Sequence, residues 1–380
     1  MDFQPDETQS RIRDLAKIFV RECVTPEAET WEREEHIPEN FLKRMAQQGF
    51  LGMVVPADYG GSGIDPVGWV LALAEVAAAS PTLGLVMSIN NQFCAAIQSA
   101  ADDEQKRRIL PDHVAGGKIG SIALTETRAG SNVTAIETSA KRTNGGYVLN
   151  GEKIFVSNGA YEGVALVCAR TSEDRRGGLT FFMVDKRAEG ARHELMPQTL
   201  GLRAANMTVH RFEDCFVRAE DRLGDEGAGF DLIQTAIGNG RIGIAAQCVG
   251  IARAALDLAI QHAQTREQFG GPLADLQAVQ FSLADMATAI DAAELTALRA
   301  AWLKARDRSW GTEAAMAKLL ASEAAGRVTD AALQIHGGGG YFADSRIARL
   351  YADARGARLF EGTTEIMRLL IARDVIGDLK

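Results

Sequence analysis

The first third of the chain shows apolar positions at helical spacing. Ile12, Leu15 and Phe19 recur three or four residues apart, and an Ala-rich apolar run extends over residues 67–79. This periodicity predicts an N-terminal all-α domain over residues 1–120.

The pattern changes to short strands in the middle of the chain. The runs YVLNGEKIFVSN, VALVCAR and LTFFMVD are rich in β-branched and aromatic residues, and Asn-Gly-Gly and Arg-Gly-Gly turns separate them. We predict a central β-barrel-like domain over residues 121–232.

Helical spacing returns in the last third. Three Ala- and Leu-rich stretches cover about residues 241–263, 273–306 and 312–335, and each is longer than a typical surface helix. Helices of this length pack side by side, so residues 233–380 are predicted to form a helical bundle.

This order of elements argues against a doubly wound nucleotide fold, in which strands and helices alternate throughout the chain. Two Gly-rich segments, Leu223–Phe230 and His336–Phe342, lack the GxGxxG spacing of a dinucleotide turn. NAD is therefore not the expected cofactor.

Composition narrows the class of protein. The chain has 380 residues, of which 46% are hydrophobic, enough for a large buried core. Its net charge of −9 lacks the basic excess of a nucleic-acid binder. Charged residues or glycines interrupt the apolar stretches before the roughly 18 residues of a membrane span, so no membrane insertion is expected.

The N-terminal sequence MDFQPDETQSRIRD has neither the order of a secretory signal nor the composition of a transit peptide, which predicts a cytoplasmic location. Five scattered cysteines without a CxxC pair fit a reducing compartment and no disulfide framework. Six histidines without a close ligand pair give no support for a metal site.

Candidate chemistry begins with the segment ALTETRAGSN, whose hydroxyls and exposed amides are able to bind carbonyl and phosphate oxygens. Four further motifs follow it in order. They are KIFVSNG (Lys153–Gly159), TREQFG (Thr265–Gly270), LQIHGG (Leu333–Gly338) and RLFEGTTEI (Arg358–Ile366). With the earlier VPADYGGSG, this series resembles the acyl-CoA dehydrogenase family across nearly the whole chain, most closely its short-chain, butyryl-CoA dehydrogenase branch.

The resemblance implies an α+β, mainly α fold: an N-terminal helical domain, a central β domain and a C-terminal four-helix bundle. It also implies FAD in each subunit of a homotetramer built as a dimer of dimers. The implied reaction is α,β-dehydrogenation of a short or branched acyl-CoA to the trans-2-enoyl-CoA, with electrons passed to an electron-transfer flavoprotein.

The resemblance also implies a set of FAD contacts. In the family, one turn and one strand flank the flavin, and residues across a dimer interface bind the diphosphate and the adenine. The matching positions are Leu124, Thr125, Phe155, Ser157, Arg266, Gln268, Phe269, Gln277, Gln334, Gly337, Gly338, Thr363 and Glu365. The usual Trp-x-Thr of the family reads Phe-Val-Ser here, which keeps an apolar face and a hydroxyl.

Glu361 is the candidate catalytic base. Its apolar neighbours Leu359 and Phe360 favour desolvation of the carboxylate and a raised pKa. The resemblance assigns the base to this position. It also implies that the backbone N–H of this residue and a flavin hydroxyl donate hydrogen bonds to the thioester carbonyl. Some family members place the base on an earlier helix, near Gly240 of this chain, and a glycine cannot serve.

Substrate contacts implied by the resemblance are Ser131, Arg241 and Gly362. Asn132 and Gly238 stand where the family often has Asp, which leaves open a dehydrogenase or oxidase acting on an acyl group carried by an acyl-carrier protein. Glutaryl-type members carry an Arg where this chain has a glycine at 84, so a dicarboxylic substrate is not expected. A catalytically silent scaffold of the same fold is the third hypothesis.

Overall fold

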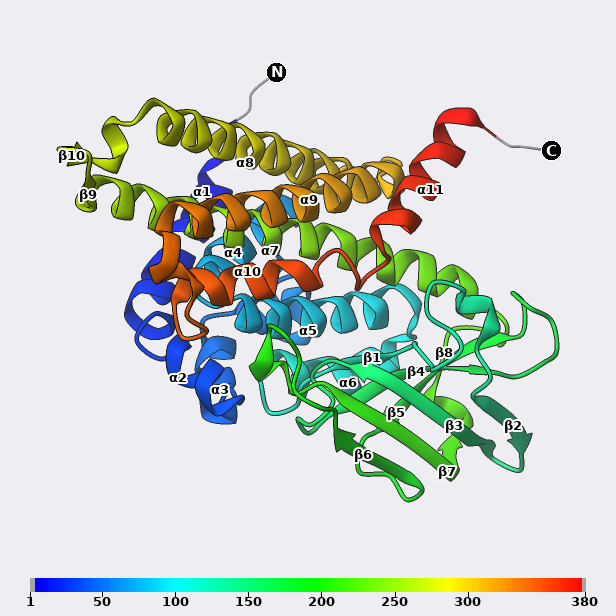
Figure 1. Ribbon diagram of the computed structural model, residues 1–380. Helices are drawn as coiled ribbons and strands as arrows, with labels where there is room; N and C mark the ends of the chain where they lie inside the picture. The colour runs from blue at the N-terminus through cyan, green and yellow to red at the C-terminus, as the bar shows by residue number, and fades with distance from the viewer. Residues whose placement is uncertain (1–3, 378–380) are drawn as a thin grey trace.

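A computed structural model describes residues 4–377 of the chain. The first three and last three residues of the predicted terminal domains lie outside this range. Helices from both ends of the chain form one helical part, and a β domain lies below it in the view of Figure 1.

The N-terminal region is helical, as its periodicity predicted. Its helices are α1 (Glu7–Phe19), α2 (Ala28–Glu34), α3 (Glu39–Gln47), α4 (Pro66–Ala79), α5 (Pro81–Ala100) and α6 (Asp103–Val114). Asp65 and Ser80 cap α4 and α5 with their side chains, and a proline follows each cap at the first helical position. Both helices are almost wholly buried, so they form the centre of the helical part.

The central region forms one eight-stranded mixed sheet. Its strands are β1 (Ser121–Ala123), β2 (Ser139–Thr143), β3 (Gly146–Val156), β4 (Val164–Arg170), β5 (Leu179–Asp185), β6 (Ala191–Leu195), β7 (Thr208–Arg218) and β8 (Arg222–Leu223). The strand order is β6-β7-β3-β2-β4-β5-β8, and β1 pairs with β4 in parallel. Within residues 4–377 no pairing joins β6 to β8, so the predicted barrel-like sheet is open at these two edges.

The C-terminal region contains the predicted long helices. They are α7 (Gly229–Thr265), α8 (Gln277–Lys304) and α9 (Gly311–His336), followed by the shorter α10 (Arg346–Gly356) and α11 (Thr364–Ile376). A small hairpin of β9 (Glu267–Gln268) and β10 (Gly271–Pro272) connects α7 to α8.

Helix α7 begins at Gly229, twelve residues before the stretch predicted from residue 241, so the predicted boundary at residue 232 lies inside it. The prediction was short because glycines at 238 and 240 look like breaks in a helix, and Gly243 lies just inside the predicted stretch. They are positions where other groups approach the helix closely: a Cβ on Gly243 would lie 2.4 Å from Ser88 Oγ.

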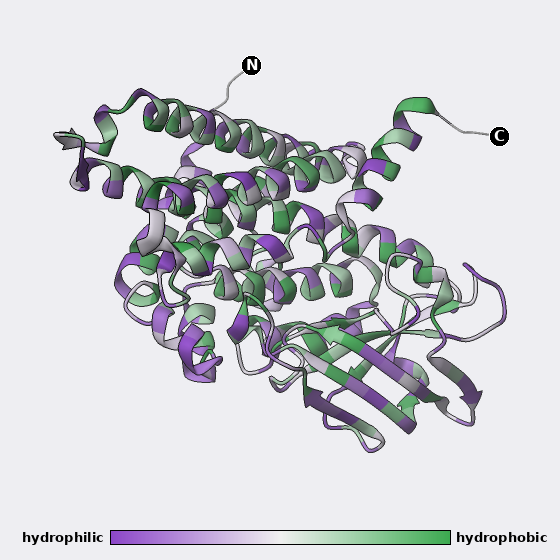
Figure 2. Cartoon of the chain, viewed as in Figure 1, coloured by the Kyte–Doolittle hydropathy of each residue, from purple (hydrophilic) through white to green (hydrophobic). Residues whose placement is uncertain are grey.

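Helix α7 is also the one helix of the described residues that is long and apolar enough to cross a membrane by length and composition. Within the structure, 78% of that apolar window is buried inside the protein. Figure 2 shows the apolar residues of this helix among those of α4 and α5, whereas the outer α2 and α3 are more polar. Its apolar character is therefore that of a core helix.

Candidate active site

Glu361 lies in the turn between α10 and α11. The turn has two consecutive residues in the left-handed region, with φ +53° at Glu361 and +92° at Gly362. The carboxylate reaches α7, where a Cβ built on Gly240 would lie only 2.5 Å from Glu361 Oε2. A side chain at position 240 would therefore displace the Glu361 carboxylate from this place.

The surroundings of Glu361 bring the pKa of its carboxyl group close to neutral pH. Burial raises the pKa of Glu361 to about 7, although a hydrogen bond with Gln92 and the charges of Arg241 and Lys318 lower it. A carboxyl with a pKa in this range is partly ionised at physiological pH, and its ionised form accepts a proton effectively.

Two buried cations lie near this carboxylate. Arg241 Nε has no hydrogen-bond partner among residues 4–377, and burial lowers the pKa of Arg241. Lys318 is fully buried on α9, donates from Nζ to the Gly362 carbonyl at 2.5 Å, and has a pKa that burial lowers to about 8. The base is thus held between positive charges in a site of low polarity.

Two residues of this cluster were missed by sequence reasoning. Gln92 lies in a buried run of α5 and donates to the Ala236 carbonyl at 2.8 Å. Lys318 is one helical turn from the buried Ala314 and Ala321, so it interrupts an apolar stripe of α9. A lone lysine on such a stripe is a sequence signal that points to a buried, functional or structural amine.

The turn that holds Leu124 and Thr125 is tied to strand β3. Thr125 O accepts a hydrogen bond from Ile154 N at 2.9 Å. Lys153, fully buried, donates from Nζ to Leu124 O at 3.0 Å and to Glu126 Oε1 at 2.7 Å. This buried ion pair fixes the predicted flavin-contacting turn against the strand that carries Phe155.

Phe155 and Ser157 lie at the end of β3, where the register with β7 is irregular. Phe155 is 55% exposed, and its backbone has φ +58°, an unfavourable conformation for an aromatic residue. A strained, exposed aromatic residue beside a fixed polar turn fits a site that a flat ring system covers. These residues therefore fit the isoalloxazine ring of the implied cofactor.

The predicted diphosphate- and adenine-binding residues form a second group. Arg266, Gln268, Phe269 and Gln277 are exposed on and after the β9–β10 hairpin, which lies at the edge of the helical part away from the β domain (Figure 1). Gln334, Gly337 and Gly338 are exposed at the end of α9.

The two halves of this second group are neighbours. The rings of His262 and His336 stack with centroids 4.5 Å apart, which joins the ends of α7 and α9. Cβ atoms on Gly337 and Gly338 would meet nothing within 4 Å, so a ligand has room to approach this backbone. One chain brings this group together but does not bring it to Phe155.

The remaining predicted residues have varied surroundings. Thr363 caps α11 by accepting from Ile366 N at 3.4 Å, and Glu365 is exposed in the first turn of that helix. Ser131 is exposed on a loop of the β domain, whereas Arg241 is buried beside the base. The two predicted substrate contacts therefore differ in accessibility.

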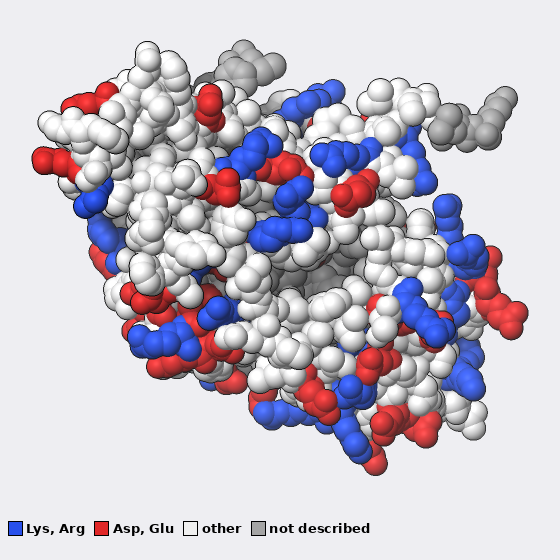
Figure 3. Space-filling model, in the orientation of Figure 1, with Lys and Arg blue, Asp and Glu red and all other residues white. Residues whose placement is uncertain are grey.

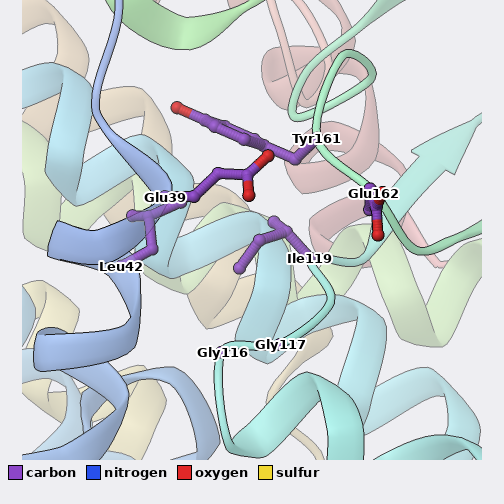
Figure 4. Close-up of a pocket in the computed structure, with 7 residues that line it drawn as sticks. All are labelled: Glu39, Leu42, Gly116, Gly117, Ile119, Tyr161 and Glu162. Atoms are coloured by element: carbon purple, nitrogen blue, oxygen red, sulfur yellow. The ribbon is translucent and has the colours of Figure 1, made fainter.

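Surface views separate this site from a small pocket elsewhere. Figure 3 shows a hollow in the centre of the face, between the helical part and the β domain. A different pocket of about 10 Å³ lies between α3 and the segments around Ile119 and Tyr161 (Figure 4). It has room for about one water and includes none of the predicted site residues, so it is not the catalytic site.

The described residues contain no group of three or more side chains suited to holding a metal ion.

Family models match three consecutive parts of the chain. The acyl-CoA dehydrogenase N-terminal domain matches residues 6–117, the middle domain residues 121–215, and the C-terminal domain residues 227–376.

Similar proteins match nearly the full length. An acyl-CoA dehydrogenase of Bacillus subtilis (strain 168) is 38% identical over 371 residues, covering 97% of this chain and 98% of that protein. The mitochondrial short-chain specific acyl-CoA dehydrogenase of Mus musculus is 38% identical, covering 96% and 89%. Acryloyl-CoA reductase (NADH) of Anaerotignum propionicum is 39% identical, covering 99% and 96%.

Solved structures share the fold. A chain from a study of the electron transferring flavoprotein of Acidaminococcus fermentans superposes with a TM-score of 0.97 at 35% identity, covering 100% of both chains. Butyryl-CoA dehydrogenase of Megasphaera elsdenii gives 0.96 at 32% identity, covering 99% and 100%. The prolyl acyl carrier protein oxidase AnaB gives 0.93 at 29%, covering 98% and 100%.

The matched domains, the full-length relatives and the site agree with the fold and the cofactor predicted from the sequence. Structural neighbours include an FAD complex, and the strained Phe155 and the fixed turn beside it fit a flavin. The named relatives are enzymes, which counts against a silent scaffold. The chain belongs to the acyl-CoA dehydrogenase family and is an FAD-dependent oxidoreductase.

Proposed function

We propose that the protein catalyses α,β-dehydrogenation of a short-chain acyl-CoA, with Glu361 as the base and an electron-transfer flavoprotein as the acceptor. The observation that carries this proposal is the half-buried Glu361, whose carboxylate lies against Gly240 and has a pKa of about 7.

The residues of the chain account for the proton-transfer half of the reaction. The Glu361 carboxylate takes the α-proton as the Cα–H bond breaks, and the electron pair of that bond becomes the new Cα=Cβ bond as the β-hydrogen departs as hydride. The backbone N–H of Glu361 has no intramolecular partner among the described residues, so it is free to donate to the thioester carbonyl.

FAD supplies the hydride acceptor when it is bound. Leu124 and Thr125 on one side and Phe155 and Ser157 on the other are the residues that we assign to the flavin ring. The buried ion pair of Lys153 and Glu126 holds this turn and this strand together.

A short acyl group is supported by how closely three helices approach one another. A Cβ on Gly243 of α7 would lie 2.4 Å from Ser88 Oγ of α5 and 2.9 Å from the Trp69 ring of α4. Gly243 lies about one turn along α7 from Gly240, and we take this close packing to limit the length of the acyl group.

The comparisons support the same substrate class and acceptor. The similar proteins include a short-chain specific acyl-CoA dehydrogenase and a butyryl-CoA dehydrogenase. The similar chain from the work on the Acidaminococcus flavoprotein supports an electron-transfer flavoprotein as the partner.

A panel of acyl-CoA thioesters tests the proposal. Under anaerobic conditions we expect butyryl-CoA to bleach the flavin absorbance rapidly and long-chain acyl-CoA to do so poorly. The variant Glu361→Gln should stay yellow and fail to bleach. Bleaching of that variant at the wild-type rate would remove Glu361 from the mechanism, and fast bleaching by long chains only would contradict the short-chain assignment.

An acyl group carried by an acyl-carrier protein is the second candidate. Gly238 replaces an Asp common in the family, and the Trp310 ring lies 2.7 Å from where its Cβ would be, so an aromatic ring fills the space of that side chain. The likeness to the prolyl acyl carrier protein oxidase supports the same alternative. Turnover of a carrier-protein thioester with release of peroxide, and none of the matching CoA thioester, would favour it.

A further inference from the structure

Lys318, like Gln92, acts on Glu361 but is not among the contacts that the family resemblance predicts. It extends from α9 to the turn that carries the base, and its Nζ donates to the Gly362 carbonyl at 2.5 Å. Its side chain is fully buried, so the ammonium has little water to replace that partner.

The turn that Lys318 holds is in an unusual conformation. Glu361 has a positive φ although it is not glycine, and such a residue needs surrounding contacts to keep it in place. A Cβ on the next residue, Gly362, would lie 2.6 Å from Met367 Cε, so the turn also has no room to shift toward α11.

Helix α9 supports the same turn at a second point. Glu323 pairs with Arg358 at 3.0 Å and accepts from Thr364 Oγ1 at 3.3 Å. These contacts hold the two ends of the segment from residue 358 to 364, whereas Lys318 holds its middle.

The titratable groups that face Lys318 come from three elements. Cys248 and Arg241 lie on α7, Glu361 lies in the turn, and Glu365 lies on α11. The groups that act on Glu361 are Gln92 of α5, Arg241 and Lys318. Glu323 supports the same turn but is not among the groups that shift the pKa of Glu361. Support of the turn by Glu323 is therefore separable from the electrostatic effect of Lys318 on Glu361.

We propose that Lys318 is a positioning residue for proton abstraction: its ammonium fixes the left-handed turn at Glu361 and Gly362 through the Gly362 carbonyl and keeps the base ionised. This role rests on the proposed function of Glu361. It adds a residue that touches neither the substrate nor the cofactor and acts through the turn.

Three variants separate the hydrogen bond from the charge. Lys318→Met removes both, Lys318→Gln keeps a neutral donor, and Glu323→Gln loosens the turn without removing a group that acts on the base. For each, the holoenzyme is incubated with acetyl-CoA in D₂O from pH 5 to 9, and deuterium at the α-carbon is measured by mass spectrometry. Acetyl-CoA has no β-carbon, so this exchange reports proton abstraction without dehydrogenation. FAD retention and the melting temperature are measured in parallel.

We expect the acid limb of the exchange rate to move upward by about one pH unit or more in both Lys318 variants, because loss of a nearby cation favours the protonated carboxyl. Glu323→Gln should lower the melting temperature and leave the limb where it is. If the exchange rate of both Lys318 variants falls at the same pH as that of the wild type, the proposal is overturned.

Failure of both Lys318 variants to fold with FAD would also overturn it, because Lys318 would then serve the stability of the bundle. If wild-type protein and Glu361→Gln exchange at the same rate, the proposed function fails instead, and the two failures are thereby distinguished.

Discussion

At the scale of single residues, the site depends on one carboxylate in an unfavourable place. Glu361 is held in a left-handed turn, against the backbone of α7, between two buried cations. Burial raises its pKa and the cations lower it, so the two effects leave it near 7. A base tuned in this way suits the abstraction of a carbon-bound proton at neutral pH.

The pH dependence of catalysis follows from this pKa. Glu361 must be ionised to act, so kcat/KM should fall about tenfold per pH unit below the pKa of about 7. Steady-state rates with butyryl-CoA between pH 5 and 9 measure this limb. A profile that stays flat down to pH 5 would show that the base keeps an ordinary carboxyl pKa.

The raised pKa of Glu361 also predicts that the free energy of unfolding changes with pH. Since the folded-state pKa lies above the ordinary value of 4.5, the folded protein binds this proton more tightly than the unfolded chain does. The stabilising effect of the protonated group is complete below pH 4.5 and is lost as the pH rises through about 7.

Glu361→Gln should therefore gain stability over the wild type between these pH values, by on the order of 1–3 kcal/mol above pH 7. Urea unfolding of both proteins at pH 4.5, 6 and 8 measures the difference. A gain that is larger at pH 4.5 than at pH 8 would have the wrong sign.

At the scale of elements, helix α7 organises the site. Its glycines let neighbouring groups come close, and one of them, Gly240, makes room for the base. Another, Gly250, lies where a Cβ would be 2.2 Å from Ala74 O of α4. The helix thus fixes the distance between the N-terminal helices and the bundle.

Gly250→Ala should force α7 and α4 apart and destabilise the protein by about 1–3 kcal/mol. A control is available on α9, where a Cβ on Gly326 would meet nothing within 4 Å. Gly326→Ala should be neutral or stabilise by up to about 1 kcal/mol, because alanine favours helix. Equal melting temperatures for the two variants would contradict the close contact.

Sequence patterns identified most elements and missed some positions for physical reasons. Helical and strand periodicities predicted the order of elements, because each long helix buries a continuous face. The first turns of α7 were missed because glycines at close contacts resemble helix breakers. Lys318 and Gln92 were missed because a polar side chain in an apolar run gives no sign of the partner that buries it.

At the scale of the whole molecule, the predicted FAD contacts fall into two groups. Phe155 and its neighbours lie at the β domain, whereas Arg266 and the end of α9 lie at the far edge of the helical part (Figure 1). From this separation we propose that one subunit completes the cofactor site of another, as the predicted homotetramer would allow.

Arg266→Ala tests this division. Loss of a charge-assisted hydrogen bond to a phosphate should weaken FAD binding by about 10- to 100-fold. Fluorescence titration of the apoprotein with FAD measures the affinity, and the exposed Arg175 supplies the control Arg175→Ala. In sedimentation experiments the wild type should lose FAD as dilution dissociates the assembly. Wild-type affinity in Arg266→Ala, or a monomer that keeps FAD, would contradict the shared site.

How far the site could be predicted also depends on scale. The motif around Glu361 and the family resemblance it carries were enough to propose the base, since its apolar neighbours and the glycine after it are adjacent in sequence. The contacts with Gly240 and Lys318 depend on the packing of α7 and α9 against the turn, which no local pattern records. The proposed role of a second subunit in the other FAD group lies beyond what the fold of one chain describes.

The most direct test is α-proton exchange from acetyl-CoA in D₂O at pH 8, followed by mass spectrometry. The wild-type holoenzyme and the control Glu104→Gln, an exposed carboxylate of α6, should incorporate deuterium at the same rate. We expect Glu361→Gln to be slower by about 100-fold or more, because a positioned general base contributes that much. Exchange in Glu361→Gln at the wild-type rate would show that another group removes the α-proton.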